Sequence, residues 1–230
     1  MTQTATASGL DGVLVAETLL SEVDGENGRL IIGGHDVEAL ALNAVFEDVC
    51  VLLWKGKLPS DAERETMRKS LAAARKEAFD RIPKLGDALD LEDGMDALRA
   101  SVAHLSATDK DQIADFTRLT AAVAVFAAAW CRKSAGCAPI APDTSLSHAA
   151  DYYRMATGKP VDPARVRALD TYLATVSDHG MNASTFTGRV VASTASDTAS
   201  AVTAAIGALK GPLHGGAPGP VLDMLDAIGK

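Results

Sequence analysis

The chain has 230 residues, of which 47% are hydrophobic and 23% charged, and its formal net charge is −8. A chain of this length buries one large core or two small ones, and its composition argues against a disordered or low-complexity protein. The negative charge, and the lack of a basic stripe interleaved with aromatic residues, argue against a nucleic-acid-binding protein.

The N-terminal residues and two apolar stretches bear on location. Residues 1–10 are small and polar, without the basic and apolar parts of a secretory signal or the arginines of a transit segment, which predicts a cytoplasmic protein. Residues 119–131 are apolar but too short to span a bilayer, and residues 190–209 carry Asp197 among Ala, Ser and Thr. We therefore expect two buried helices and no membrane span.

Strand signals are confined to the N-terminal part of the chain. Leu30, Ile31 and Ile32 lie between glycines within residues 28–34, a pattern that predicts one arm of a short hairpin. Aromatic residues make up only 4% of the chain and alternating patterns are scarce. The predicted fold class is therefore mainly α.

Helix signals begin with a capping box. Ser60 followed by Glu63 has the required spacing and predicts a helix over residues 61–79. Thr108 begins a second predicted helix, which is apolar on nearly all sides over residues 119–130.

Two more helices are predicted in the C-terminal half. Asp162 followed by Pro163 is a cap with proline at the first helical position, and it predicts a helix over residues 164–176. Residues 190–209 are rich in Ala, Ser and Thr, whose short side chains allow helix axes to approach closely. This helix is expected to end in the loop that carries His214.

The cysteines indicate no metal site. Cys50, Cys131 and Cys137 form no CxxC pair and no cluster with histidine, so we expect reduced thiols in or near the core and no bound metal.

Two of the five histidines stand in unusual surroundings. His214 lies among glycines and a proline in the segment GPLHGGA (211–217), which alternates flexible and rigid backbone beside one imidazole. His179 follows a predicted helix and precedes a run of hydrogen-bonding residues that includes Asn182. From the residues alone, functional and structural roles stay open for both. His35, His104 and His148 are interpreted as surface or satisfied core residues, the last on a predicted helix.

The segments SDHGMNASTF (177–186) and LKGPLHGGA (209–217) resemble the citrate synthase family. Further similar segments are residues 24–30, 34–40, 52–59, 95–99 and 143–149. The resemblance implies a mainly α fold, the large helical domain of that family with a short N-terminal β-hairpin. Residues 1–217 would form this domain in part, and residues 218–230 the first helix of a small domain that is otherwise missing.

The resemblance also implies a reaction, the condensation of acetyl-CoA with oxaloacetate to citrate and coenzyme A. His214 would be the catalytic residue that hydrogen-bonds the thioester carbonyl, where a preorganised donor stabilises the developing enolate. His179 and Asn182 would bind oxaloacetate. No cofactor is implied, since acetyl-CoA is a substrate, and family members are homodimers.

Several alternatives stay open. The family's second catalytic histidine, its aspartate base and its carboxylate-binding arginines have no counterpart in these 230 residues, so this chain alone is expected to be almost inactive. It would be a fragment, one subunit of a split enzyme with a complementary subunit, or a non-catalytic helical dimerisation module. Propionyl-CoA in place of acetyl-CoA, giving 2-methylcitrate, is a further alternative, because one methylene is worth only about 1–3 kcal/mol of discrimination.

Overall fold

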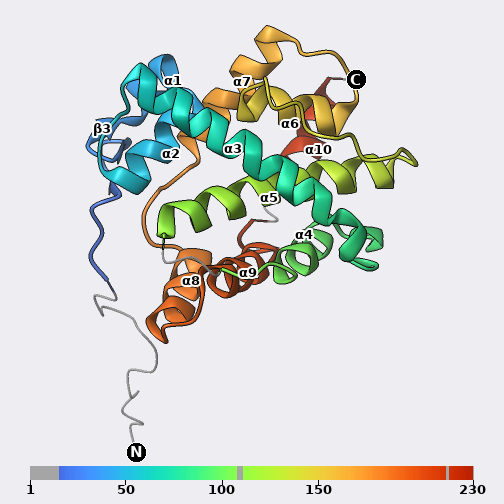
Figure 1. Cartoon of the computed structure of the whole chain (residues 1–230). Helices are drawn as coiled ribbons and strands as arrows, with labels where there is room; N and C mark the ends of the chain where they lie inside the picture. The colour runs from blue at the N-terminus through green and yellow to red at the C-terminus, as the bar shows by residue number, and fades with distance from the viewer. Residues whose placement is uncertain (1–15, 108–110, 216–217, 230) are drawn as a thin grey trace, which may run out of the picture.

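The computed structural model describes residues 16–107, 111–215 and 218–229, and the mainly α prediction is confirmed. Within these residues the structure has ten α-helices, two short 3-10 turns and one antiparallel sheet (Figure 1). The strands are β1 (Ser21–Asp24), β2 (Arg29–Ile32) and β3 (His35–Asp36). The helices are α1 (Val37–Asn43), α2 (Phe46–Lys55), α3 (Asp61–Arg81), α4 (Gly94–Ala103), α5 (Gln112–Ser134), α6 (His148–Thr157), α7 (Pro163–Thr175), α8 (Ala183–Ser193), α9 (Thr198–Leu209) and α10 (Pro218–Ile228).

The small sheet contains the predicted hairpin arm. β2 pairs antiparallel with β1, with Val23 opposite Leu30, and β3 adds a third strand. Ile32 is fully buried against the first helices. Gly33 has φ +55°, and a Cβ atom there would lie 2.6 Å from the side chain of Leu52, so a residue without a side chain lets the sheet pack onto α2.

The predicted caps of α3 and α7 are confirmed. The backbone N–H of Ser60 donates to Glu63 over 2.9 Å, and the Ser60 hydroxyl accepts from the Glu63 N–H. Asp162 accepts from the N–H groups of the first turn of α7, where Pro163 is the first residue. α3 runs two residues beyond the predicted end, to Arg81.

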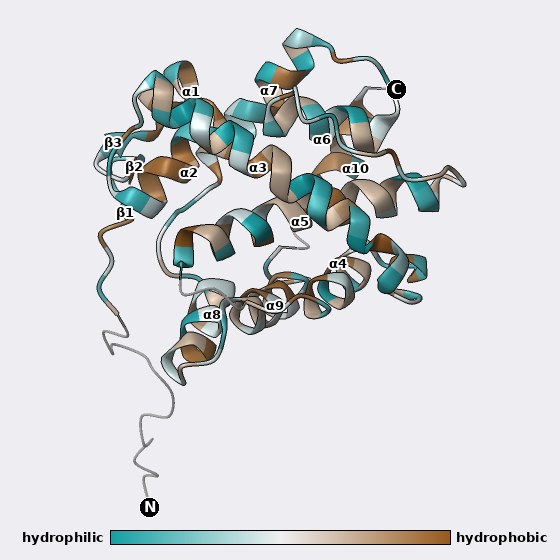
Figure 2. Cartoon of the chain, viewed as in Figure 1, coloured by the Kyte–Doolittle hydropathy of each residue, from teal (hydrophilic) through white to brown (hydrophobic). Residues whose placement is uncertain are grey.

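Helix α5 forms the centre of the molecule and packs against α3, α4 and α6 (Figure 1). Asp111 caps it, and Thr108, which was predicted to begin it, lies outside the described residues. By length and composition α5 alone among the described helices is apolar enough to cross a membrane. However, ten of its residues are buried inside the protein, and hydrophilic residues alternate with apolar ones in its N-terminal turns (Figure 2). It is therefore a core helix, as predicted.

The prediction of one buried helix over residues 190–209 is wrong. α8 ends at Ser193 and α9 begins at Thr198, because the Asp197 side chain accepts from the Ser200 N–H and caps a new helix. No residue of α8 is buried, and α9 buries only Ala199 and Ile206.

The expected close approach of helices is nevertheless present between α8 and α9. A Cβ atom at Gly188 would lie 3.6 Å from the backbone oxygen of Ala201 and from the side chain of Ala205. These distances are ordinary van der Waals contacts, so small residues bring the two helices together.

The three cysteines differ in their burial, and α10 is the last helix of the fold. Cys50 is buried, Cys131 is half-buried, and Cys137 is exposed, so the expectation of a position in or near the core is wrong for Cys137. α10 stands where residues 218–230 were predicted to form a helix, and its large apolar side chains are exposed. Its assignment to a second domain stays a prediction.

Candidate active site

His179 lies in the connection between α7 and α8, and its side chain is exposed. Its two neighbours are held in place. Asp178 accepts a hydrogen bond from the Gly180 N–H over 3.0 Å and another from the Ser21 hydroxyl of β1. Gly180 has φ +85°, a left-handed conformation that favours glycine.

Asn182 is the N-cap of α8. Its side-chain oxygen accepts from the Thr185 N–H over 2.9 Å and from the Ser184 hydroxyl over 2.8 Å. These two donors orient the amide and occupy its oxygen. The amide NH2 group makes no hydrogen bond within the described part of the chain, so it is the group that Asn182 offers to a ligand.

His214 lies in a tight turn that follows α9. The backbone N–H of His214 donates to the Gly211 carbonyl over 2.9 Å, and the backbone N–H of Gly215 donates to the Leu209 carbonyl over 2.8 Å. A Cβ atom at position 215 would lie 2.4 Å from the Leu209 carbonyl oxygen, so only glycine allows this turn. Lys210 anchors the same segment to α4 through an ion pair of 2.5 Å with Asp96.

One hydrogen bond joins the two histidine motifs. The Ser184 hydroxyl lies 2.9 Å from Nε2 of His214 and 2.8 Å from the Asn182 side-chain oxygen. The structure thus brings Asn182 and His214 together through Ser184, and places His179 in the loop just before Asn182. No hydrogen bond joins His179 to the other two among the residues described.

Ser184 was not singled out from the sequence. The available signal was its position in the first turn of a helix capped by Asn182, where a hydroxyl two residues after the cap lies near the cap's own oxygen. Its contact with His214 spans 30 residues of sequence, and no local pattern predicts such a contact.

Among the remaining histidines, His148 confirms its interpretation as a satisfied core residue. The residue is 4% exposed, and its ring stacks on Phe46 with ring centroids 4.9 Å apart. Burial, together with the neighbouring Arg75 guanidinium, lowers the pKa of His148 to about 3. The imidazole is therefore neutral over the physiological range.

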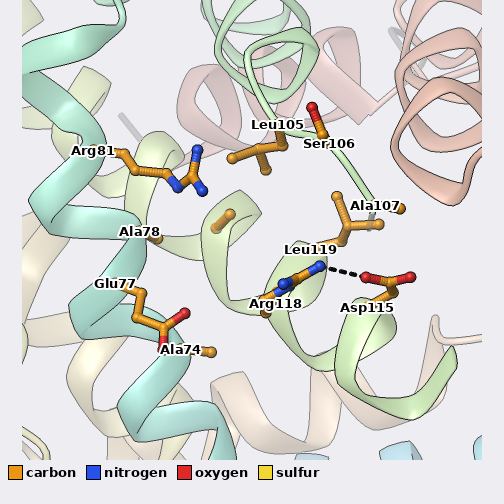
Figure 3. A pocket seen from close by; sticks show the side chains of 11 residues that line it. Ala74, Glu77, Ala78, Arg81, Leu105, Ser106, Ala107, Asp115, Arg118 and Leu119 are labelled. Carbon is orange, nitrogen blue, oxygen red and sulfur yellow. Dashed lines mark hydrogen bonds and ion pairs between the residues drawn. The ribbon is translucent and has the colours of Figure 1, made fainter. Parts of the chain in front are cut away.

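A small cavity of about 60 Å³ lies apart from the histidine motifs, between α3, α5 and residues 105–107 (Figure 3). Its polar groups come from Glu77, Arg81, Ser106 and the ion-paired Asp115 and Arg118. None of the predicted site residues lines it. In the described ranges, no group of three or more His, Cys, Asp or Glu side chains is arranged to hold a metal ion.

Comparison with known proteins identifies the family. A family model described as the citrate synthase C-terminal domain matches residues 9–230. Citrate synthase from Haloferax volcanii is 41% identical over 96% of this chain, and 2-methylcitrate synthase from Mycobacterium tuberculosis is 38% identical over 96%. The chain belongs to the citrate synthase family.

Solved structures agree with this assignment. Citrate synthase from Thermotoga maritima superposes with a TM-score of 0.84 at 34% identity over 97% of this chain. Citrate synthase from Thermoplasma acidophilum, in a ternary complex with carboxymethyl coenzyme A and oxaloacetate, gives 0.80 at 28% identity over 95%. The chain spans about three-fifths of the length of these relatives, 61% for the H. volcanii and T. maritima proteins and 60% for the T. acidophilum protein.

Proposed function

We propose that this chain carries part of the active site for a citrate synthase-type condensation. In this reaction the methyl group of acetyl-CoA loses a proton, the resulting enol attacks the ketone carbon of oxaloacetate, and water hydrolyses the citryl-CoA product to citrate and coenzyme A. The observation that supports the proposal is the Ser184–His214 contact of 2.9 Å, because it joins both family motifs in one place.

In this proposal His214 stabilises the enol oxygen of acetyl-CoA. Ser184 has one hydroxyl proton and two acceptors within reach, the Asn182 oxygen and Nε2 of His214. The described geometry directs the hydroxyl proton to the Asn182 oxygen. When this proton turns to Nε2 of His214 instead, the ring proton of a neutral imidazole resides on Nδ1, from which it can be donated to the thioester oxygen. Redirection of the Ser184 proton from Asn182 to His214 therefore gives the tautomer that the reaction needs. A preorganised donor of this kind typically contributes about 10²–10³ in rate.

His179 and Asn182 are proposed to bind oxaloacetate. The exposed imidazole of His179 and the free amide NH2 group of Asn182 offer hydrogen-bond donors to the oxygens of a dicarboxylate. The general base of the reaction is not assigned to a residue of this chain. Acetyl-CoA acts as substrate, no cofactor is required, and a cytoplasmic location stays a prediction.

The test is an assay of oxaloacetate-dependent thiol release from acetyl-CoA, combined with calorimetric titration of oxaloacetate. We expect wild-type protein to bind oxaloacetate measurably, with slow or no turnover by this chain alone. His179→Ala should weaken binding, while the matched control His104→Ala, at another exposed histidine, should leave it unchanged. Equal effects of the two substitutions, or no binding by wild-type protein, would contradict the proposal.

We propose acetyl-CoA as the thioester substrate, and propionyl-CoA is the alternative. Both citrate and 2-methylcitrate synthases are relatives of similar identity, 41% and 38%. One additional methylene changes the free energy by only about 1–3 kcal/mol. Titrating both thioesters in the presence of oxaloacetate tests the choice, and tighter binding of propionyl-CoA would reverse it.

Assembly is the second candidate function, favoured by two bare apolar surfaces. α10 exposes Leu222, Leu225 and Ile228 by 54–74%. A groove of about 420 Å³ between α5, α6 and α7 is lined mainly by apolar side chains, and Tyr172 at its side is 59% exposed. Surfaces of this kind mark contacts with further protein. We propose a homodimer, with association to a complementary subunit as the alternative.

Sedimentation equilibrium distinguishes these forms of assembly. A dimer of this chain alone, weakened by Leu225→Glu or Tyr172→Asp, would support self-association through one of these surfaces. A monomer at all concentrations would exclude the homodimer. The exposed Leu42→Glu on α1 serves as a control for the general effect of an added charge.

A further inference from the structure

The N-terminal sheet touches the loop that carries His179. The Ser21 hydroxyl donates to the Asp178 carboxylate across 157 residues of sequence. The connection from α7 to α8 descends on the side of the molecule where the sheet lies (Figure 1). This contact therefore links the beginning of the described chain to the proposed oxaloacetate-binding histidine.

A second contact lies on the other side of His179. A Cβ atom at Gly180 would meet the Val23 side chain at 3.5 Å and the Ser21 hydroxyl at 3.9 Å. Ser21 and Val23 are alternate residues of β1, so their side chains project from the same face of the strand. That face thus lies against both neighbours of His179.

The conformation of the loop at residues 178–180 depends on these contacts. Asp178 closes a local turn by accepting from the Gly180 N–H over 3.0 Å, and the Ser21 hydroxyl shares the same carboxylate oxygen. Gly180, at φ +85°, is a residue type with wide conformational freedom. Without the strand, the carboxylate would keep only its local partner among the residues described, and the direction of the intervening His179 would be poorly determined.

We propose that β1 positions His179 for oxaloacetate, with Ser21 as the positioning residue acting through Asp178. The inference rests on the proposed function, in which His179 binds the substrate. The strand itself is held independently of the loop. Glu22 pairs with Ile31 of β2, and the Gly33 N–H donates to the Leu20 carbonyl over 2.7 Å. Loss of the Ser21 hydroxyl should therefore loosen the loop without dissolving the sheet.

The test compares Ser21→Ala, Ser21→Thr and Glu22→Ala in the full chain. Threonine retains the hydroxyl, and Glu22 lies on the opposite face of the same strand. With ¹⁵N-labelled histidine, Ser21→Ala should shift and broaden the His179 ring signals, and the other two variants should not. Oxaloacetate affinity in Ser21→Ala should fall about threefold to tenfold, in keeping with the loss of a hydrogen bond to a charged group at a partly exposed site. The midpoint of thermal unfolding serves as the check on global stability.

Three outcomes are decisive. Unchanged His179 signals in Ser21→Ala would overturn the inference, as would an equal change in Glu22→Ala. Restoration by threonine supports it. If Ser21→Ala does not fold, Val23→Ala tests the same face through the Gly180 contact. If wild-type protein does not bind oxaloacetate, the proposed function fails, whereas the histidine signals still report whether β1 orders the loop.

Discussion

The histidine at the centre of the molecule and the histidines at its edge have opposite surroundings. His148 is enclosed by Phe46 and by Arg75, whose guanidinium lies 3.4 Å from Nδ1 of the ring. His214 is half-buried, and within the described residues its ring has one side-chain partner, the Ser184 hydroxyl. The comparison shows that an imidazole with many fixed partners contributes to folding, whereas an imidazole with one adjustable partner remains available to a ligand.

The polar groups around His148 form a buried network. Arg75 and Asp151 are fully buried and form an ion pair of 2.8 Å between α3 and α6. Asp151 also pairs with Arg154 and accepts from the Asp143 N–H. In the described structure only Glu47 Oε2 and the Ser101 hydroxyl are buried without a hydrogen-bond partner. Buried networks with so few unsatisfied atoms specify one packing arrangement.

Among the substitutions considered, Arg75→Met should lower the free energy of unfolding most. Removing one member of a buried ion pair leaves the other charge uncompensated, and such changes cost about 3–5 kcal/mol. We expect the lower end of this range, because Arg154 still contacts Asp151. Urea unfolding measures the effect. Arg165→Met, which breaks an exposed pair with Asp162, is the matched control and should cost less than about 1 kcal/mol. Equal costs would show that the central network is no more important than a surface pair.

The second prediction concerns pH and His148. Its folded pKa is about 3, below the ordinary value of 6.5, so the unfolded chain binds the proton more readily between these values. Stability from a neutral His148 is complete above pH 6.5 and is lost as the pH falls towards 3. The difference in unfolding free energy between wild type and His148→Phe should therefore shrink by about 1.4 kcal/mol for each pH unit in this window.

Glu47 contributes the opposite trend, because burial raises the pKa of its carboxyl group. Glu47 is present in both proteins, and its hydrogen bond comes from the backbone N–H of residue 148, so its contribution should largely cancel in the comparison. A pH-independent difference between wild type and His148→Phe would contradict the assignment of a depressed pKa to His148.

A smaller effect is expected from Ser147→Ala, which removes the cap of α6. The Ser147 hydroxyl accepts from the Ala150 N–H over 3.3 Å, and loss of such a cap costs about 1 kcal/mol. Urea unfolding should show a lower free energy of unfolding, while the slope of that free energy against urea concentration stays unchanged. A cost above that of Arg75→Met would reverse the ranking of contacts in the central region.

The smallest effect on stability is expected from Ser184→Ala at the edge of the molecule. It removes a part-buried hydroxyl, so unfolding should become easier by no more than about 1 kcal/mol. The ring ¹⁵N signals of His214 should nevertheless change, because Nε2 of the imidazole loses the Ser184 hydroxyl as its hydrogen-bond partner. Thr187→Ala, which removes a hydroxyl bonded within α8, is the control and should leave His214 unchanged. A His214 spectrum unaffected by Ser184→Ala would refute the role of Ser184.

Local features of the fold were predictable from the sequence, and tertiary ones were not. The caps at Ser60 and Asp162 involve neighbours within three residues, so their patterns are visible in the sequence. Asp197 signals a cap in the same way, but it was overlooked within a run of small residues. The burial of Arg75 depends on Asp151, which lies 76 residues further along the chain, and no local pattern indicates it.

The same distinction applies to the candidate site. His179, Asn182 and His214 were found through their resemblance to family motifs, and their surroundings explain the glycines beside them. The contacts that join the motifs, Ser184 to His214 and Ser21 to Asp178, connect segments that only the folded chain brings together. Sequence motifs therefore gave the candidate site residues, and the structure shows which residues contact them.

The most direct test of the central claim, that the two histidine motifs form one site, is to follow the histidine NMR signals while ligands are added. Oxaloacetate should move the His179 signals, and subsequent addition of acetyl-CoA should move those of His214 with higher affinity than in the absence of oxaloacetate. The His148 and His104 signals should stay in place. A His214 signal that ignores acetyl-CoA, or that responds to it identically with and without oxaloacetate, would contradict the account.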